Sequence, residues 1–212
     1  MKITKEETVL FLAPHTDDAE FGAGGTMAKL LNQGNIVHHV AFSTAQVTSE
    51  HGMMNQVLVT EIKEANRILG LAPENLVIHD FQVRRFMERR QEILDLLIYY
   101  SKQIKPDIVF VPSGRDIHQD HATISQEAIR AFKTKTILGY ELVWNNLSFD
   151  LDVFIEISEQ DITKKINACA AYNSQAYRNP YRDDFIRALA VARGVQVKKQ
   201  YAEVFEAIRI NL

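Results

Sequence analysis

The sequence has a single cysteine, Cys169, which excludes an intrachain disulfide. That cysteine stands in the apolar stretch 168–171, where we expect a buried thiol rather than a nucleophile. The sequence also lacks any run of the roughly 18 apolar residues that a membrane-spanning helix needs. Residues 1–7 do not form the apolar core of a signal peptide. We therefore expect a cytoplasmic protein that does not enter a membrane.

An excess of positive charge is missing as well. Lysine and arginine total 24 against 27 acids, and the formal net charge of −3 provides no global attraction to nucleic acid or to acidic lipids. The basic pairs in the chain are short and lie among acids, so we expect them on solvated surfaces. These features exclude a nucleic-acid partner as the first hypothesis.

Short apolar runs alternate with helical patterns, which predicts βαβ units. Strands are predicted over residues 8–13, 36–42, 75–79, 107–112 and 136–141, and helices over residues 26–31, 57–69, 89–104 and 122–132. A glycine-rich turn is predicted between the first strand and the first helix. The expected fold class is α/β, with a Rossmann-like, mostly parallel sheet and helices on both faces.

The last 60 residues are less regular. Residues 153–157 and 202–208 have the pattern of strands, and residues 162–172 and 183–192 have the pattern of helices. We expect this C-terminal part to form a cap or an edge of the same sheet. The chain, residues 1–212, is therefore predicted to be a single domain.

A dense group of polar residues follows the first predicted strand. His15, Asp17 and Asp18 lie within four residues on a strand-to-helix turn, and zinc accepts such nitrogen and oxygen ligands. The alternatives are that an aspartate caps the helix, or that glycines 22, 24 and 25 form a dinucleotide-binding turn. The glycine spacing does not match the dinucleotide fingerprint, and the acids would repel a pyrophosphate.

A second group follows the fourth predicted strand. His118, Asp120 and His121 lie within four residues, and Asp120 can orient one histidine through its second ring nitrogen. The alternative is that Asp120 merely caps a helix and both histidines are exposed. Because ligands bind at the carboxyl ends of parallel strands, we expect both groups to meet there and to form a metal site.

The two motifs together resemble the PIG-L/LmbE family of zinc-dependent N-acetylglucosaminyl deacetylases. The family carries His-Pro-Asp-Asp followed by Gly-x-Gly-Gly-Thr, and later His-x-Asp-His. The corresponding segments here are His15-Thr16-Asp17-Asp18, Gly22-Ala23-Gly24-Gly25-Thr26 and His118-Gln119-Asp120-His121.

The resemblance implies a role for each motif residue. His15, Asp18 and His121 would be zinc ligands, Asp17 the general base and His118 the residue that stabilises the tetrahedral oxyanion. Asp120 would hold His118 in position and favour its charged form.

Two positions depart from the family pattern. Thr16 replaces the usual proline, and Ala19 replaces a common glutamate, with an acid at Glu20 instead. Neither position is a ligand in the family. These departures therefore bear on the substrate rather than on the metal.

Other polar residues near strand ends are candidates for binding substrate. A guanidinium suits hydroxyl, carboxylate or phosphate groups, and an aromatic face suits a sugar ring. The candidates are Arg84, Arg85, Arg115, Glu141 and Trp144, each with surface or packing roles as the alternative. His51, in the polar loop after the second strand, is a candidate lid residue.

The leading hypothesis is a hydrolase that removes an N-acyl group, usually acetyl, from an amino sugar or an amino-sugar conjugate. One alternative keeps the metal but uses another small amide, such as a thiol conjugate. Others are a nucleotide-binding α/β module and a non-catalytic metal-binding protein. A His-Asp-His site also accepts iron and other divalent ions. The sequence leaves a homo-oligomer open.

Overall fold

The computed structural model describes residues 6–45, 55–176 and 182–211. Its strands are β1 (Thr8–His15), β2 (Ile36–Ser43), β3 (Leu76–Ile78), β4 (Ile108–Pro112), β5 (Thr136–Tyr140), β6 (Val153–Ile157) and β7 (Tyr201–Arg209). Its α-helices are α1 (Asp18–Asn32), α2 (Gln56–Leu69), α3 (Arg90–Gln103), α4 (Gln119–Ala131), α5 (Glu159–Ala170) and α6 (Asp183–Gln196). Short 3-10 turns span Pro73–Asn75, Phe86–Arg89 and Asn173–Gln175.

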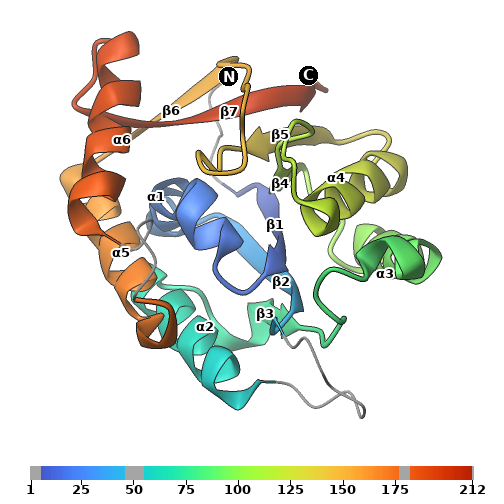
Figure 1. The fold of residues 1–212 in the computed structure, drawn as a ribbon. Helices are drawn as coiled ribbons and strands as arrows, with labels where there is room; N and C mark the ends of the chain where they lie inside the picture. The colour runs from blue at the N-terminus through green and yellow to red at the C-terminus, as the bar shows by residue number, and fades with distance from the viewer. Residues whose placement is uncertain (1–5, 46–54, 177–181, 212) are drawn as a thin grey trace.

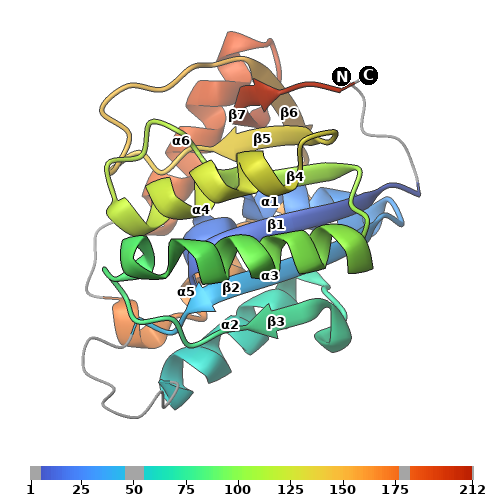
Figure 2. The ribbon, with the colours of Figure 1, turned by 90° about the vertical axis from the view of Figure 1, so that its right-hand side faces the viewer.

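The strands form one seven-stranded sheet in the order β3-β2-β1-β4-β5-β7-β6. The first five strands of that order pair in parallel, whereas β7 pairs antiparallel with both β5 and β6. Figure 2 shows this order from β3 at the bottom to the antiparallel edge at the top. The predicted α/β class is confirmed, and the C-terminal strands extend the edge of the sheet as expected.

Helices cover both faces of the sheet, as Figure 1 shows: α1, α2, α5 and α6 lie on one side, and α3 and α4 on the other. The reason is visible in β1, where side chains alternate between faces. Val9 and Phe11 belong to the core beneath the four-helix side, and Leu10 and Leu12 to the core beneath α3 and α4. The apolar residues of this run are all buried, which is why the sequence pattern indicates a central strand.

The glycine-rich segment differs from the prediction. It is not a turn: α1 begins at Asp18 and runs through all three glycines, with one non-helical residue at Ala23. The glycines are needed for close packing, because a Cβ at Gly22 would lie 2.2 Å from Cδ2 of Tyr140, and one at Gly25 would lie 2.6 Å from Cδ1 of Ile157.

The kink at Ala23 leaves backbone amides inside α1 without a helical acceptor, and a carboxylate from another part of the chain accepts hydrogen bonds from them. The backbone amides of Gly25 and Thr26 donate to the two carboxylate oxygens of Glu203, at 3.0 and 2.6 Å. Nζ of Lys165 lies 2.6 Å from Oε1 of Glu203 and completes a buried ion pair. These amides therefore hold an internal acid, which argues against the dinucleotide-binding alternative.

Cys169 is fully buried, and burial raises the pKa of its thiol well above the ordinary value, as expected for an inert cysteine. Within the described residues, none of the helices combines the length and the apolar character needed to cross a bilayer. His51, the candidate lid residue, lies outside the described residues.

Candidate active site

The two motif segments meet at one edge of the sheet. His15 ends β1, and β1 pairs in parallel with β4, so the loop after β4 and the start of α4 lie beside it. His15, Asp17, Asp18, His118 and His121 all line one open cavity. The sequence-based expectation that these groups converge is met by the geometry.

Three ligand-type atoms in this cavity form a nearly equilateral triangle. Nδ1 of His15 lies 3.1 Å from Oδ2 of Asp18 and 3.1 Å from Nε2 of His121, and the latter two atoms are 3.2 Å apart. Zinc bonds of about 2.0–2.2 Å place neighbouring ligand atoms of a tetrahedron about 3.3 Å apart. The residues present therefore fit a divalent metal with one coordination position open toward the cavity.

His118 offers a further imidazole. One ligand atom each from His15, His118 and His121 lies within 4.8 Å of the others. Nδ1 of His118, however, accepts a hydrogen bond from the backbone amide of Asp120 at 3.2 Å and so caps the N-terminus of α4. The described residues therefore offer two candidates for a third ligand beside His15 and His121: Asp18, whose Oδ2 lies 3.1 and 3.2 Å from their nitrogens, and His118.

Carboxylates behind the histidines fix their rings. Nδ1 of His121 lies 2.7 Å from Oδ2 of Asp116, and Nε2 of His15 lies 3.1 Å from Oδ2 of Asp120. The carboxylate of Asp120 also accepts from the backbone amide of Arg84 at 2.6 Å. Such acids orient metal-binding imidazoles and set which nitrogen faces the metal. The expected carboxylate contact from Asp120 to His118 is thus replaced by one to His15.

The carboxylates also set the protonation of the two ligand-type histidines. Burial acts to lower the pKa of His15, but the charge of Asp18 and the hydrogen bond to Asp120 raise it to about 8. The pKa of His121 rises to about 10 against the effect of burial, because Asp18 and Asp116 both face it. Burial acts to raise the pKa of Asp18, but the charges of His121 and His15 lower it well below its usual value. An excess of negative charge therefore surrounds these rings.

His118 behaves differently. Burial together with the nearby charges of His121 and His15 lowers the pKa of His118 to about 4. A neutral ring whose Nδ1 accepts a hydrogen bond carries its proton on Nε2. These neighbours disfavour the charged form of His118 that the resemblance implies.

Asp17 stands at the N-cap position of α1, but its side chain makes no capping hydrogen bond. Its carboxylate lines the cavity next to Asp18, which instead accepts from the backbone amide of His15 at 2.8 Å. The helix-capping alternative for Asp17 is therefore not what the structure has.

The comparisons with known proteins agree with this geometry. The sequence model of PIG-L, described as GlcNAc-PI de-N-acetylase, matches residues 10–132, which is more than half of the chain. The chain belongs to the PIG-L family. It is 28% identical to a protein described as the uncharacterized deacetylase YaiS of Escherichia coli K12, over 80% of this chain and 92% of that protein.

Two solved structures carry the same fold as this PIG-L chain. The conserved protein TT1542 from Thermus thermophilus superposes with a TM-score of 0.78 and 25% identity, covering 97% of this chain and 96% of that one. The N,N'-diacetylchitobiose deacetylase from Pyrococcus horikoshii has a TM-score of 0.76 and 22% identity, covering 94% and 83%. The latter likeness is evidence for the fold alone.

The candidate substrate residues of this PIG-L chain separate into two groups. Arg84 and Trp144 line the cavity that holds the histidines. The other three do not: Arg85 pairs with Glu88, Arg115 pairs with Asp150 at 2.5 Å, and Glu141 pairs with Arg193. The sequence did not distinguish the two groups, because the position of a residue in a loop does not reveal which way its side chain points.

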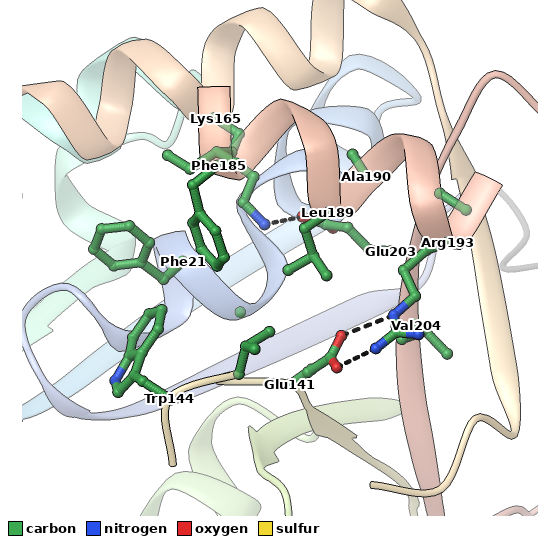
Figure 3. Close-up of a pocket in the computed structure, with 14 residues that line it drawn as sticks. Phe21, Glu141, Trp144, Lys165, Phe185, Leu189, Ala190, Arg193, Glu203 and Val204 are labelled. Carbon is green, nitrogen blue, oxygen red and sulfur yellow. Dashed lines mark hydrogen bonds and ion pairs between the residues drawn. The ribbon is translucent and has the colours of Figure 1, made fainter. Parts of the chain in front are cut away.

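A second, mostly apolar pocket adjoins the active-site cavity (Figure 3). Phe21 and Trp144 line both cavities, and their rings meet edge to face with centroids 5.4 Å apart. Figure 3 shows Phe185 beside them and the ion pair of Glu141 and Arg193 at the opposite end. The charges in this pocket are therefore already paired within the chain.

Sequence reasoning missed several residues of the site. Asp116 is the most important, because it contacts His121 and also accepts from the backbone amide of His118 at 2.8 Å. Asn145 donates to Asp116 at 3.3 Å and, with Gln175, adds amide groups to the cavity wall. The signal for Asp116 was its place two residues before the second motif; Gln175 had no local signal.

Glu20 is fully buried in the first turn of α1. Its carboxylate accepts hydrogen bonds from Tyr172 at 3.0 Å and from Asn66 at 2.9 Å, and burial raises its pKa to about 8. The Tyr172 hydroxyl also lies 2.5 Å from the carbonyl oxygen of Thr16. Thr16 stands where the family has proline. Its carbonyl is therefore held by the hydroxyl of Tyr172, which follows α5, and not by the rigidity of a proline ring.

Proposed function

We propose that this PIG-L chain is a metal-dependent hydrolase that removes an N-acetyl group from an amino sugar or an amino-sugar conjugate. One observation carries the proposal: ligand-type atoms of His15, Asp18 and His121 lie 3.1–3.2 Å apart in the cavity that Asp17 and His118 also line. We assign His15, Asp18 and His121 as the ligands of the metal, and zinc as the metal.

A zinc ion bound there would supply Lewis-acid activation of a water molecule and polarisation of the acyl carbonyl. Asp17 accepts the proton that the attacking water loses, since its carboxylate faces the same cavity without capping α1. His118 donates from Nε2 to the acyl oxygen as negative charge develops there. Asp17 then returns the proton to the departing amine. The hydroxyl of the water is thus in the carboxylic acid and its proton in the amine.

Asp120 and Asp116 act through the histidines. Asp120 positions His15 through its carboxylate and His118 through its backbone amide, and Asp116 positions His121. The family's description as a de-N-acetylase of an N-acetylglucosamine conjugate supports an N-acetyl amino sugar as substrate. We further propose that residues 1–212 act as one catalytic domain, supported by the continuous sheet from β1 to β7.

The test is release of acetate from a panel of N-acetyl amino sugars, with bound metal measured in the same preparations. We expect the wild type to contain about one divalent ion and to release acetate. Asp17→Asn should keep the metal and lose activity by roughly 10²- to 10⁴-fold, the usual contribution of a general base. His121→Ala should lose the metal, and His118→Ala should keep it.

The matched control is Asp150→Asn, which removes an exposed carboxylate paired with Arg115 outside the cavity. It should retain both metal and activity. Full activity in Asp17→Asn would overturn the assignment of the base. Loss of metal in His118→Ala with retention in Asp18→Asn would replace Asp18 by His118 as the third ligand.

A further inference from the structure

Arg84 is the arginine that lines the active-site cavity in the described part of the chain. It is exposed at the cavity wall, on the loop between β3 and the 3-10 turn that begins at Phe86. The proposed hydrolysis assigns no role to this side chain, because the metal ligands, the base and the oxyanion donor are all other residues.

The side chain of Arg84 has no partner within the described chain. Among residues 6–45, 55–176 and 182–211, each other arginine bonds a carboxylate or, for Arg209, backbone carbonyls. Arg84 alone of these makes no side-chain hydrogen bond and no ion pair in this part of the structure. A guanidinium left unpaired beside a catalytic cavity is available to a ligand.

The backbone holds Arg84 at the site. Its φ of 68° is in the left-handed region, which is unfavourable for a residue with a Cβ. Its amide donates to Oδ2 of Asp120 at 2.6 Å, and the same oxygen lies 3.1 Å from Nε2 of His15. One carboxylate therefore ties the Cα of Arg84 to a proposed metal ligand and fixes where the side chain starts.

The other side chains of described residues on the cavity wall include no further arginine and no lysine. Besides the histidines and the two aspartates of the first motif, the lining is neutral: amides of Asn145 and Gln175, the hydroxyl of Thr16 and apolar groups. Among the described residues, Arg84 is thus the one arginine or lysine on the cavity wall that a substrate would meet.

We infer that Arg84 binds an oxyanion, a carboxylate or a phosphate, that the substrate carries in addition to its N-acetyl group. A guanidinium forms two parallel hydrogen bonds to either anion, and no neutral sugar hydroxyl offers the same pairing. The enzyme therefore selects acidic amino sugars over neutral ones. This inference rests on the proposed function for the reaction and adds the substrate class.

The first measurement compares kcat/KM for four compounds: N-acetylglucosamine, its 1-phosphate, its 6-phosphate and N-acetylmuramic acid. The phosphates and the carboxylate of N-acetylmuramic acid distinguish the two sources of the anion. We expect the wild type to prefer one acidic compound by about 10- to 100-fold, as a charge-assisted hydrogen bond provides. In Arg84→Gln that preference should fall to near unity, and the change should appear in KM for the acidic compound.

The matched control is Arg89→Gln, which removes an exposed guanidinium paired with Glu92 outside the cavity. It should keep the full preference. Arg84→Lys should keep part of it, because a lysine retains the charge but not the paired geometry. Metal content should be equal in all four proteins.

A second measurement separates this inference from the reaction itself. Calorimetry gives the affinity for the same four compounds in Asp17→Asn, which prevents turnover, and in Asp17→Asn combined with Arg84→Gln or with Arg89→Gln. Arg84-dependent binding of an acidic compound without any turnover in the active background would keep the anion site and reject deacetylation. Equal binding of acidic and neutral compounds, or a preference that survives Arg84→Gln, would overturn the role of Arg84.

Discussion

Nδ1 of His121 lies 2.7 Å from Oδ2 of Asp116, and both side chains are almost completely buried. The contact leaves Nε2 of His121 directed at His15 and Asp18. The other oxygen of Asp116 accepts from the backbone amide of His118 at 2.8 Å. A single carboxylate therefore orients one proposed metal ligand and fixes the loop that carries the proposed oxyanion donor.

Replacing Asp116 by asparagine should weaken metal binding. The amide has the shape of the carboxylate but loses its charge, so it no longer enhances the basicity of His121. We expect the dissociation constant for zinc to rise about 10- to 100-fold, measured by competition with a chromophoric chelator. Asp184→Asn, which removes an exposed acid paired with Arg182, is the control and should bind zinc as the wild type does. Equal affinity in Asp116→Asn would show that His121 needs no carboxylate behind it.

Gly22→Ala should destabilise the fold. The added methyl group would lie 2.2 Å from Cδ2 of Tyr140, a fully buried ring whose hydroxyl donates to Leu12. Overpacking of this kind costs about 1–3 kcal/mol, which exceeds the gain of about 1 kcal/mol in helix propensity. Urea unfolding measures the difference. Gly114→Ala is the control, since its methyl group would meet Glu206 at an ordinary 3.6 Å, and a similar loss there would refute the packing explanation.

Glu203→Ala should be among the more damaging substitutions outside the active site. It leaves the buried ammonium of Lys165 and the amides of Gly25 and Thr26 without their acceptor. Breaking a buried ion pair by removing one partner costs about 3–5 kcal/mol in the free energy of unfolding. Glu156→Ala removes an acid from a half-exposed pair with Lys199 and should cost less than about 1 kcal/mol. Comparable losses in the two variants would contradict this account.

His39 should make stability depend on pH on the acid side. Burial lowers its pKa from 6.5 to about 4, while Nδ1 bonds the side chain of Asn66 at 2.9 Å. Between pH 6.5 and pH 4 the unfolded state binds a proton that the folded state does not, so stability falls as the pH falls. The contribution of His39 is about 1.4 kcal/mol per pH unit within that window.

The measurement is urea unfolding of metal-free wild type and His39→Gln from about pH 4 to about pH 8. Glu20 lies 4.0 Å from Nδ1 of His39 and has the opposite effect, because its raised pKa of about 8 makes stability fall as pH rises from 4.5 to 8. The comparison with the variant isolates His39. Parallel profiles for the two proteins would show that His39 does not titrate with folding.

The residues of the active-site cavity were largely predictable from local sequence. The two His/Asp motifs lie at or shortly after the ends of the mainly apolar strands β1 and β4, and the ends of these neighbouring parallel strands meet at one edge. The sequence did not predict which aspartate contacts which histidine. The resemblance implies that Asp120 holds His118; in the structure its carboxylate bonds His15, and its backbone amide donates to His118.

The glycines of the first motif show a different limit. Their spacing in the sequence indicated a turn, since glycine favours unusual backbone angles. In the structure they lie within α1, where they permit contact with Tyr140, Ile157 and Lys165 from three later segments. Contacts between residues so far apart in the chain leave no local signature.

By itself, the sequence determined the order of strands and helices and the residue types available for chemistry, because both follow from local periodicity and side-chain chemistry. The tertiary structure decided which acid serves which histidine, placed Asp116 among them, and left Arg84 unpaired beside the site while pairing Arg85 and Arg115 elsewhere. The physical reason is that hydrogen bonds and ion pairs act only at contact distance, and the fold alone brings distant segments that close.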